Sequence, residues 1–329
     1  MPLRPLVSIV CPAFEEEAVL PEFHCALSDA LNGLLDQFRF EIVYVDDGSR
    51  DRTYETLRDI AEFDQRVRVF SLSRNFGHQA ALTAGLDHAA GEAIVTLDSD
   101  LQHPPSLIPQ LIAQWRRGFD VVQTIRAGEP AAGWWKRTTS AAFYRLLRRW
   151  TDLDVRPAGA DFRLLSRRAL DGLCSMRESH RYLRGMIQWM GFRVAEVPFA
   201  PDPRRAGVSK YTWAKMVRLA LDGLCSFSRA PLRLAVAAGI AATSFSLLAS
   251  LVLLVVRMRD WPVAAVVTAG HLVLLALFAT VGVLGEYVGR VYEECKHRPP
   301  YLIQDAFPLS AFESTPADGP ARSVQRPAA

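Results

Sequence analysis

The 329-residue sequence lacks paired cysteines and a strong excess of either charge. Its five cysteines are odd in number and widely spaced, without a Cys-x-x-Cys pair, which argues against a disulfide framework and a zinc site. The formal net charge is only +3, with arginines spread among acidic residues, so charge gives no reason to expect a nucleic-acid partner. We therefore expect reduced, buried thiols and no nucleic acid among the partners.

Two further features are missing near the N-terminus. The apolar residues Leu6 to Cys11 run directly into polar ones, so no charged segment with a following stretch of signal length is present. No Gly-x-Gly-x-x-Gly or Walker-type loop follows this run. We expect the N-terminal domain to stay in the cytosol, and a metal with arginines to take the place of backbone groups in binding phosphate.

What the first part of the chain does contain is an alternation of short β-rich runs with amphipathic stretches. The β-rich runs are 7–11, 40–45, 67–72, 93–97 and 120–123, and the amphipathic stretches include 53–63 and 107–117. This alternation predicts an α/β fold with a mainly parallel sheet covered by helices. Ligands bind such sheets beyond the carboxyl ends of the strands. Polar clusters occupy those ends, at 12–17, 46–49, 73–79 and 98–103, so we expect four loops to converge at one edge.

Two long uncharged runs, 234–256 and 263–285, are joined by a short polar link. At about 1.5 Å per residue each reaches roughly 34 Å, which is enough for a hydrocarbon core of about 30 Å. The expectation is a hairpin of two spanning helices, and the alternative is a buried helical pair in a large soluble core. Basic residues flank the pair on its outer sides: Lys215, Arg218, Arg229, Arg233, Arg290, Lys296 and Arg298. They favour both ends in the cytosol, although Arg257 and Arg259 lie in the link.

The segments around this pair suggest three further features. Residues 210–228 combine aromatic, apolar and basic side chains, which fits either an interfacial helix or an amphipathic helix facing a core. The tail from Ser310 has a composition typical of disorder. Small residues between Ala237 and Ala242 could pack against another helix, which favours a homo-oligomer.

The sequence Asp98-Ser99-Asp100-Leu101-Gln102 directly follows the fourth β-rich run. Two carboxylates and an amide oxygen suit Mg²⁺ or Mn²⁺, and a cation there could stabilise a departing diphosphate. A solvated turn is the alternative. Asp46-Asp47-Gly48-Ser49 ends the second run, where the carboxylates could accept hydrogen bonds from a base or ribose, or form a turn with Ser49 capping the next helix.

Taken together, these segments resemble the inverting family 2 glycosyltransferases of the GT-A fold, particularly the branch that uses polyprenyl phosphate, over about residues 5–303. The matching stretches are 7–16, 45–49, 73–81, 98–105, 136–137, 160–164, 205–211 and 286–292. The resemblance implies a membrane enzyme of the bacterial inner membrane that transfers one sugar from a nucleotide donor to polyprenyl phosphate on the cytoplasmic side. It implies a GT-A catalytic domain at 1–209, a juxtamembrane helix at 210–231, two transmembrane helices within 232–288 and a C-terminal segment at 289–329.

The resemblance also implies roles for individual residues. Pro12, Phe14, Glu16, Asp46, Asp47, Asp98 and Ser99 would line the nucleotide-sugar pocket, and Asp98, Asp100 and Gln102 would bind Mg²⁺ or Mn²⁺. Arg126, Arg137, Arg205, Ser209 and Lys210 would bind the acceptor phosphate, because arginine binds phosphate oxygens in a bidentate manner. The catalytic set would be Asp100, Asp161 and Arg126, with Asp161 chiefly positioning other groups and a base role secondary. Surface salt bridges are the alternative for the arginines.

The sequence departs from the family pattern at three positions. Glu15 stands where Asn is common, His103 where Asp is common, and Ala160 where Gly precedes the Asp of the Gly-Asp-Phe-Arg-Leu motif. None of these changes removes an expected metal ligand. Ala160 affects the placement of Asp161, because alanine restricts backbone angles that glycine permits.

Two other functions would require features that the sequence does not have. A processive polysaccharide synthase would show a Gln-x-x-Arg-Trp motif, which Gln114-Trp115-Arg116-Arg117 does not match, and more than two spans. A catalytically dead membrane partner would have lost metal ligands, yet Asp98, Asp100 and Gln102 are all present. For the donor we expect UDP-glucose, with UDP-galactose, a modified pentose donor and GDP-mannose left open.

Overall fold

The computed structural model describes residues 4–126, 159–179, 181–199, 230–256 and 262–308. The chain divides into two compact units, one built on a β-sheet and the other helical. In chain order the sheet unit contains β1 (Leu6–Ala13), α1 (Leu20–Asn32), β2 (Arg39–Asp46), α2 (Thr53–Phe63), β3 (Val67–Leu72), α3 (His78–His88), β4 (Ala93–Thr96), the 3-10 turn η1 (Pro105–Leu107), α4 (Ile108–Arg116), β5 (Val121–Arg126), β6 (Gly159–Ser166), α6 (Arg167–Ser175), α7 (Leu183–Trp189), β7 (Val194–Phe199) and β8 (Ile303–Phe307). The helical unit contains α9 (Ala230–Val256) and α10 (Pro262–Cys295).

The described strands form a single sheet in the order β7-β5-β6-β4-β1-β2-β3-β8. β1 pairs in parallel with β2 and β4, β2 with β3, and β5 with β7. β6 and β8 run antiparallel to their neighbours. The predicted α/β fold with a mainly parallel sheet is therefore confirmed, and the five predicted β-rich runs correspond to β1–β5.

Helices cover both faces of the sheet. Apolar residues of α1, α2 and α4, such as Phe23, Leu57 and Leu111, form one buried cluster with Ile9 of β1 and Val95 of β4. On the other face α3 packs so closely that a Cβ on its Gly85 would lie 2.3 Å from a methyl carbon of Val10. Alternating residues of β1 thus pack against different helices, which is why the run reads as continuously apolar.

β6 and β8 extend the sheet in a way that the sequence pattern did not predict. β6 places Thr96 of β4 opposite Arg163, so the start of β6 lies beside the end of β4. β8 comes from the C-terminal segment, for which no strand was predicted, and pairs with β3. Only Ala306 of β8 is buried, because it is an edge strand, and this leaves a weak apolar pattern.

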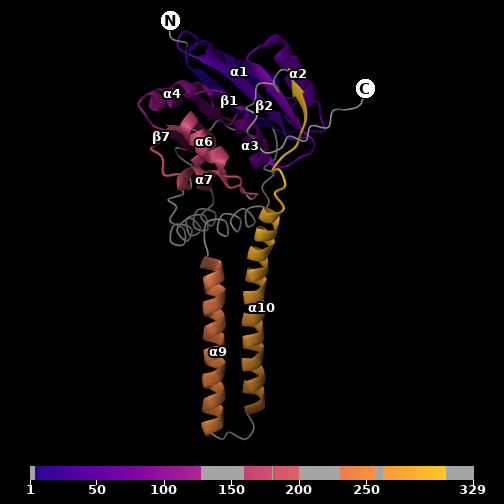
Figure 1. Cartoon of the computed structure of the whole chain (residues 1–329), viewed down its shortest axis with the longest axis vertical. Coiled ribbons are helices and arrows are strands. Elements are labelled where there is room, and N and C mark those ends of the chain that lie inside the picture. The colour runs from indigo at the N-terminus through magenta and orange to yellow at the C-terminus, as the bar shows by residue number, and fades with distance from the viewer. Residues whose placement is uncertain (1–3, 127–158, 180, 200–229, 257–261, 309–329) are drawn as a thin grey trace. The chain divides into compact units, whose positions relative to one another are not determined.

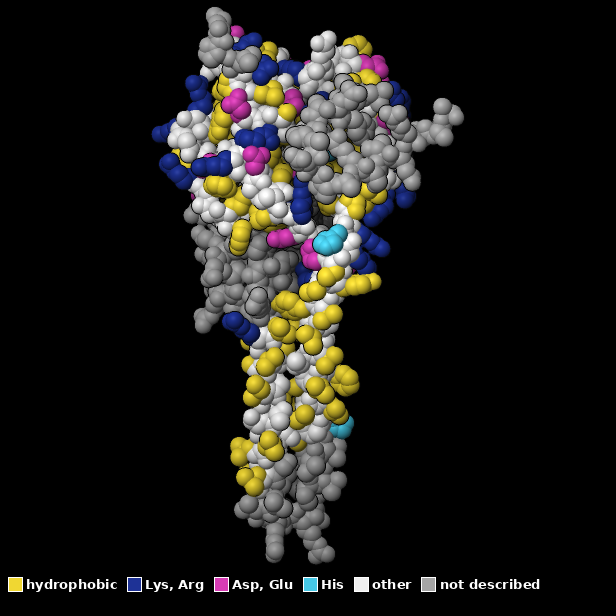
Figure 2. Space-filling model, in the orientation of Figure 1, with side chains coloured by type: hydrophobic (Ala, Val, Ile, Leu, Met, Phe, Trp, Pro, Cys, Tyr) yellow, Lys and Arg dark blue, Asp and Glu magenta, His cyan; other side chains and the backbone are white. Residues whose placement is uncertain are grey.

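The described part of the helical unit consists of two long apolar helices, as predicted (Figure 1). The windows Leu232–Ala249 and Thr268–Cys295 have mean hydropathies of 1.7 and 2.0, and neither is buried within the structure. On the face that Figure 2 shows, many exposed apolar side chains lie along the described parts of both helices. α9 and α10 contact each other where the Thr280 hydroxyl donates to the Ala235 carbonyl at 3.1 Å. A helical pair buried in a soluble core is not what the described residues show.

Two segments with sequence-based expectations lie largely or wholly outside the described residues. The juxtamembrane segment 210–231 lies outside the described residues except for its last two positions, and the tail from Ser310 lies wholly outside them.

Candidate active site

The loops after β1, β2, β3 and β4 meet at the carboxyl edge of the sheet, as predicted, because these four strands are parallel. Hydrogen bonds join the loops to one another. The Asp47 amide donates to the Ala13 carbonyl at 2.9 Å, and the Glu16 amide donates to the Thr53 hydroxyl at 2.9 Å. The edge is therefore a connected framework.

Asp46 and Asp47 are buried and brace this framework. Asp46 accepts from the Ser49 amide at 3.1 Å and from the Ser71 hydroxyl at 2.9 Å. Asp47 accepts from the backbone amides of Phe76 at 2.8 Å and Gly77 at 2.9 Å. Burial raises the pKa of Asp47, and these amide bonds oppose that rise. Of the two carboxylates predicted to contact nucleotide, Asp47 thus holds the loop that follows β3, and Asp46 joins the loop after β2 to β3 itself.

Ser49 and Ser99 also connect loops. Helix α2 begins at Thr53, so Ser49 does not cap it; the Ser49 hydroxyl instead accepts from the Glu15 amide at 3.0 Å. Ser99 is buried, and its hydroxyl lies 2.8 Å from the Pro12 carbonyl and also hydrogen bonds to the Glu16 carboxylate. Pro12, Glu16 and Ser99, all predicted to line the nucleotide pocket, are brought together by these contacts.

Glu15 has a left-handed backbone, with φ at +53°. Such a conformation costs most L-residues about 1–2 kcal/mol, whereas asparagine adopts it more readily. We expect Glu15→Asn to raise the free energy of unfolding by about 0.5–1 kcal/mol, measured as a shift in the denaturation midpoint. Glu15→Ala is the control, because alanine removes the carboxylate without favouring this backbone. Equal stabilisation by alanine would contradict the backbone explanation.

Asp98 faces two histidines at the end of β4. Its Oδ1 lies 2.8 Å from Nε2 of His78, the first residue of α3, and its Oδ2 lies 3.5 Å from Nδ1 of His103. Burial lowers the pKa of His78, but the hydrogen bond and charge of Asp98 outweigh it and raise the pKa to about 9. Burial likewise raises the pKa of Asp98, and the His78 contact holds it below its usual value. The two side chains therefore form an ion pair at neutral pH.

Asp100 and Gln102 converge within one turn. Asp100 Oδ1 accepts a hydrogen bond from the backbone amide of Gln102 at 3.1 Å. Asp100 Oδ2 lies 2.6 Å from the side-chain Nε2 of the same residue. Leu101 between them has φ at +59°, which folds the chain back on itself. Flipping the Gln102 side-chain amide would exchange its nitrogen and its oxygen, which are similar in shape. The amide oxygen would then lie beside the Asp100 carboxylate.

The residues at this edge fit the predicted divalent cation in part. Among the described residues, no group of three or more His, Cys, Asp or Glu side chains is arranged to hold a metal. Mg²⁺, however, is usually bound by one or two carboxylates together with substrate phosphates and water. Asp100 and Gln102 fit the protein's share of such a site, while Asp98 is paired with His78.

Asp161, near the start of β6, binds two arginines. Arg184 of α7 donates Nε to Oδ1 and Nη2 to Oδ2, each at 3.0 Å, and Nη2 of Arg163 also binds Oδ1. Burial raises the pKa of Asp161, but the charges of Arg184 and Arg163 outweigh it and hold the pKa far below its usual range. A carboxylate so stabilised is a weak base, which agrees with the predicted positioning role.

The antiparallel direction of β6 explains why Asp161 reaches this edge. Thr96 ends β4, and its hydroxyl donates to the carbonyl of Asp161. Asp161 therefore lies beside the chain that continues to Asp98. No role was predicted from the sequence for Arg163 or Arg184. The position of Arg163 within the Asp-Phe-Arg-Leu stretch was the one signal that could have indicated its role.

The predicted phosphate-binding residues can be placed only in part. Arg126 ends β5, and its side chain is not described. Arg137, Arg205, Ser209 and Lys210 lie outside the described residues. Phe14 follows β1 in the loop that holds Glu16 and is half-buried.

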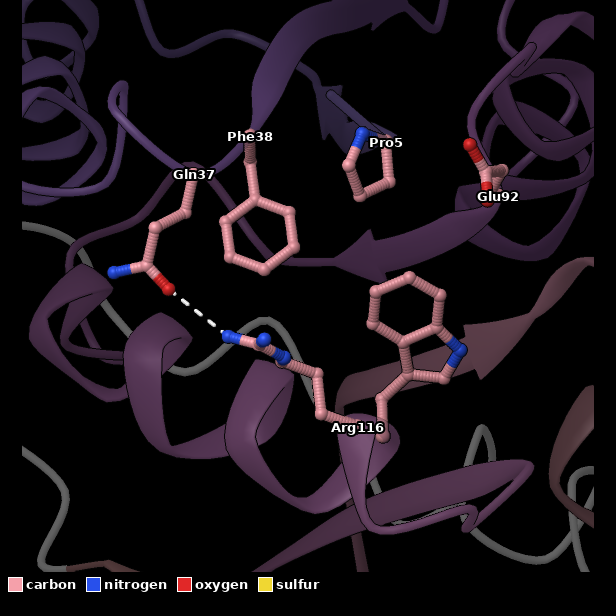
Figure 3. Close-up of a pocket in the computed structure, with 6 residues that line it drawn as sticks. Pro5, Gln37, Phe38, Glu92 and Arg116 are labelled. Carbon is pink, nitrogen blue, oxygen red and sulfur yellow. Dashed lines mark hydrogen bonds between the residues drawn. The ribbon is translucent and has the colours of Figure 1, made fainter. Parts of the chain in front are cut away.

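A cavity of about 380 Å³ lies at the opposite edge of the sheet (Figure 3). Pro5, Phe38 and Glu92, which precede β1, β2 and β4, line it together with Gln37, Trp115 and Arg116. Arg116 Nη1 donates to Gln37 Oε1 at 2.9 Å. No residue predicted for the site lines this cavity, so it is separate from the candidate active site.

Comparison with known proteins agrees with this geometry. The sequence profile described as "Glycosyl transferase family 2" matches residues 8–174. A Bacillus subtilis (strain 168) protein named "Uncharacterized glycosyltransferase YkcC" is 39% identical over 308 residues, covering 91% of this chain and 94% of its own. The bactoprenol glucosyl transferase of Shigella phage SfV is 35% identical over 307 residues, covering 91% and 98%. A prophage bactoprenol glucosyl transferase homolog of Escherichia coli (strain K12) is 34% identical over 306 residues, covering 91% and 98%.

Proposed function

This chain belongs to glycosyl transferase family 2, and we propose that, as a glycosyltransferase of that family, it transfers a single hexose from a UDP-sugar to polyprenyl phosphate. The observation that favours this acceptor is the similarity to bactoprenol glucosyl transferases along 91% of the chain, a span too long to be confined to the sheet unit. Glucose is the first choice of sugar for the same reason. The product would be a polyprenyl-phosphate-linked sugar for modification of cell-envelope glycans.

The acceptor chemistry agrees with the residues around Asp161. By analogy with phosphoproteins, a lipid phosphate has a second pKa near 6 and is largely dianionic at pH 7. One of its oxygens can attack the anomeric carbon as the bond to UDP breaks, which inverts that centre without a general base. Asp161 forms ion pairs with Arg163 and Arg184, so a positioning role suits it better than proton abstraction.

The donor is proposed to lie along the carboxyl edge of the sheet. Asp100 and Gln102 would bind Mg²⁺ or Mn²⁺, with Asp98 beside them. When bound, the cation would neutralise charge on the UDP leaving group. The nucleotide pocket would take its shape from a framework of Pro12, Glu16, Asp46, Asp47 and Ser99, with Phe14 beside it. The acceptor phosphate would be bound by Arg126, Arg137, Arg205, Ser209 and Lys210.

The position of β8 supports a hairpin of two spans. β1 to β7 precede α9 and β8 follows α10, yet all eight belong to one sheet. If α9 and α10 both cross a membrane, the chain must therefore leave and return on the same side. The basic flanks favour the cytoplasmic side of a bacterial inner membrane. The uncharged part of α10 ends before Glu286, which forms an ion pair with Arg290 at 2.9 Å.

The proposal is tested by following radiolabel from a panel of nucleotide sugars into lipid extracts, using purified full-length protein and polyprenyl phosphate. We expect one labelled product, formed from UDP-glucose, and a loss of at least about 100-fold in rate with EDTA that excess Mg²⁺ or Mn²⁺ restores. A magnesium-saturated EDTA sample is the matched control. Absence of product with every donor would refute the proposed function, and product formation unaffected by EDTA would refute the metal dependence alone.

A further inference from the structure

Residues 299–302 form a strap that brings the chain back into the sheet unit ahead of β8. Two consecutive residues of the strap make contacts that are well separated. The Leu302 carbonyl accepts from the Ser73 amide at 2.9 Å, and the Tyr301 hydroxyl donates to Asp87 Oδ2 at 2.9 Å. Ser73 begins the loop that leads to α3, and Asp87 is the last residue but one of α3. The strap therefore holds both ends of the segment 73–88.

The contact of Tyr301 with Asp87 is shielded from solvent. The Asp87 side chain is 10% exposed, and its Oδ2 also accepts from Arg177 Nη1 at 2.8 Å. Burial and the charge of Asp87 raise the pKa of Tyr301, so its hydroxyl keeps its proton and acts as the donor. Hydrogen bonds to a carboxylate are among the stronger ones in proteins. The strap is thus firmly joined to the end of α3.

The buried side of α3 explains why contacts at its ends matter. Three of its buried residues, Ala81, Ala84 and Gly85, carry at most a methyl group. A Cβ on Gly85 would lie 2.3 Å from a methyl carbon of Val10, so the helix lies very close to the sheet. Packed helices are held in place by side chains that fit the grooves of their neighbours. Small side chains give few such contacts, which leaves the end contacts more of the task of fixing α3 along its axis.

The position of α3 affects the candidate active site directly. The helix begins at His78, whose Nε2 lies 2.8 Å from Asp98 Oδ1. His78 and Asp87 are nine positions apart, which is about 13 Å along a helix. Because a helix is a rigid element, a displacement at Asp87 would carry His78 with it. The Asp98 carboxylate would then lose its fixed orientation.

We propose that Tyr301 is a positioning residue for the nucleotide-sugar site, which it serves by holding α3 so that His78 fixes the Asp98 carboxylate. This inference rests on the proposed function, because it concerns the site assigned there to the donor. It gives a task in that site to a residue that follows both long helices in the chain.

The test measures the affinity of wild-type protein and Tyr301→Phe for UDP by calorimetry, using full-length protein in detergent with Mn²⁺. Phenylalanine keeps the ring and removes the hydrogen bond, so we expect UDP binding to weaken by about 5- to 10-fold. KM for the nucleotide sugar should rise by the same factor, and KM for polyprenyl phosphate should stay within about twofold of wild type. Unchanged UDP binding, or an equal rise in both KM values, would overturn the inference.

A double-mutant cycle with His78→Gln tests the path through α3. His78→Gln should itself weaken UDP binding by at least as much as Tyr301→Phe does. Changes this far apart with no shared partner ordinarily add. If Tyr301 acts through His78, adding Tyr301→Phe to His78→Gln should change UDP binding by less than about twofold. Additive losses, or normal UDP binding in His78→Gln, would contradict the proposed path.

Arg58→Met is the matched control. The Arg58 guanidinium lies over the ring of Phe307 at 5.3 Å, so it holds β8 against α2 and not against α3. This variant should leave UDP binding within about twofold of wild type. An equal loss would mean that any loosening of β8 is sufficient, and the role given to Tyr301 would be wrong. Asp87→Asn weakens the Tyr301 contact from the side of α3 and should repeat its effect if Tyr301→Phe does not fold.

Hydrogen exchange provides a measurement that needs no nucleotide. Peptides from residues 73–88 should exchange at least about threefold faster in Tyr301→Phe than in wild type, and at the wild-type rate in Arg58→Met. Wild-type exchange in Tyr301→Phe would overturn the inference. Failure of the proposed function looks different: wild-type protein would form no product with any donor, while the exchange rates would still decide whether Tyr301 holds α3.

Discussion

Replacing Asp100 with asparagine is expected to lower kcat for sugar transfer by about 10²- to 10³-fold. The substitution keeps the shape of the side chain but removes the negative charge that a hard divalent cation prefers. In the structure the Asp100 carboxylate hydrogen bonds to Gln102 in its own loop, and no other described contact depends on it. The loss should therefore fall on chemistry and metal affinity and leave folding nearly intact.

The measurement is initial rate against Mn²⁺ concentration, at saturating donor and acceptor. For Asp100→Asn the concentration giving half-maximal rate should rise, and the thermal midpoint should stay within about 2 °C of wild type. Asp59→Asn, an exposed position on α2, is the control and should match wild type in both. Wild-type rates and metal dependence in Asp100→Asn would place the cation elsewhere.

Replacing Gly48 with alanine is expected to destabilise the sheet unit by about 3–5 kcal/mol and to abolish transfer. Gly48 has φ at +66°, and an added Cβ would lie 2.4 Å from the carbonyl carbon of Arg74 and 2.7 Å from the nitrogen of Asn75. Backbone atoms cannot rotate away as a long side chain can. The loops after β2 and β3 would have to separate, which would break the Asp47 bonds to Phe76 and Gly77.

Gly191→Ala separates the two causes of this loss. Gly191 has the same φ of +66°, but nothing lies within 4 Å of the position that an added Cβ would take. It should cost only the backbone strain, about 1–2 kcal/mol. Denaturant unfolding of both variants measures the difference, and equal losses would show that the close approach to Arg74 contributes nothing.

Much of the fold could be predicted because β1 to β5 are short apolar runs between amphipathic helices. β6 was not predicted as a strand, because Arg163 lies at its centre and is nearly fully buried, which is rare for arginine. β7 alternates exposed and buried residues but includes Pro198, which is uncommon inside strands. The antiparallel direction of β6 and β8 depends on contacts between segments far apart in the chain, which local patterns do not encode.

The site could be predicted to the level of its loops. The polar residues after β1 to β4 lie at one edge because parallel strands end there together. It could not be predicted which carboxylates hold the protein's own loops in place, since the hydrogen bonds to Asp47 come from backbone amides about 30 residues away. The pairing of Asp161 with Arg184 likewise joins β6 to α7, across 23 positions of the sequence.

The pairing of β8 with β3 has a consequence for biosynthesis. Ribosomes deliver the chain from its N-terminus, at about 5–20 residues per second. Of the strands that the structure describes, seven are made before the two long helices and the eighth is made after them. The Ser73 amide, which donates to the Leu302 carbonyl at 2.9 Å, must therefore wait for its partner until both helices have been synthesised. The loop leading to His78 can reach its final form only then, so a nascent chain acquires its complete active site after its helical pair has been made.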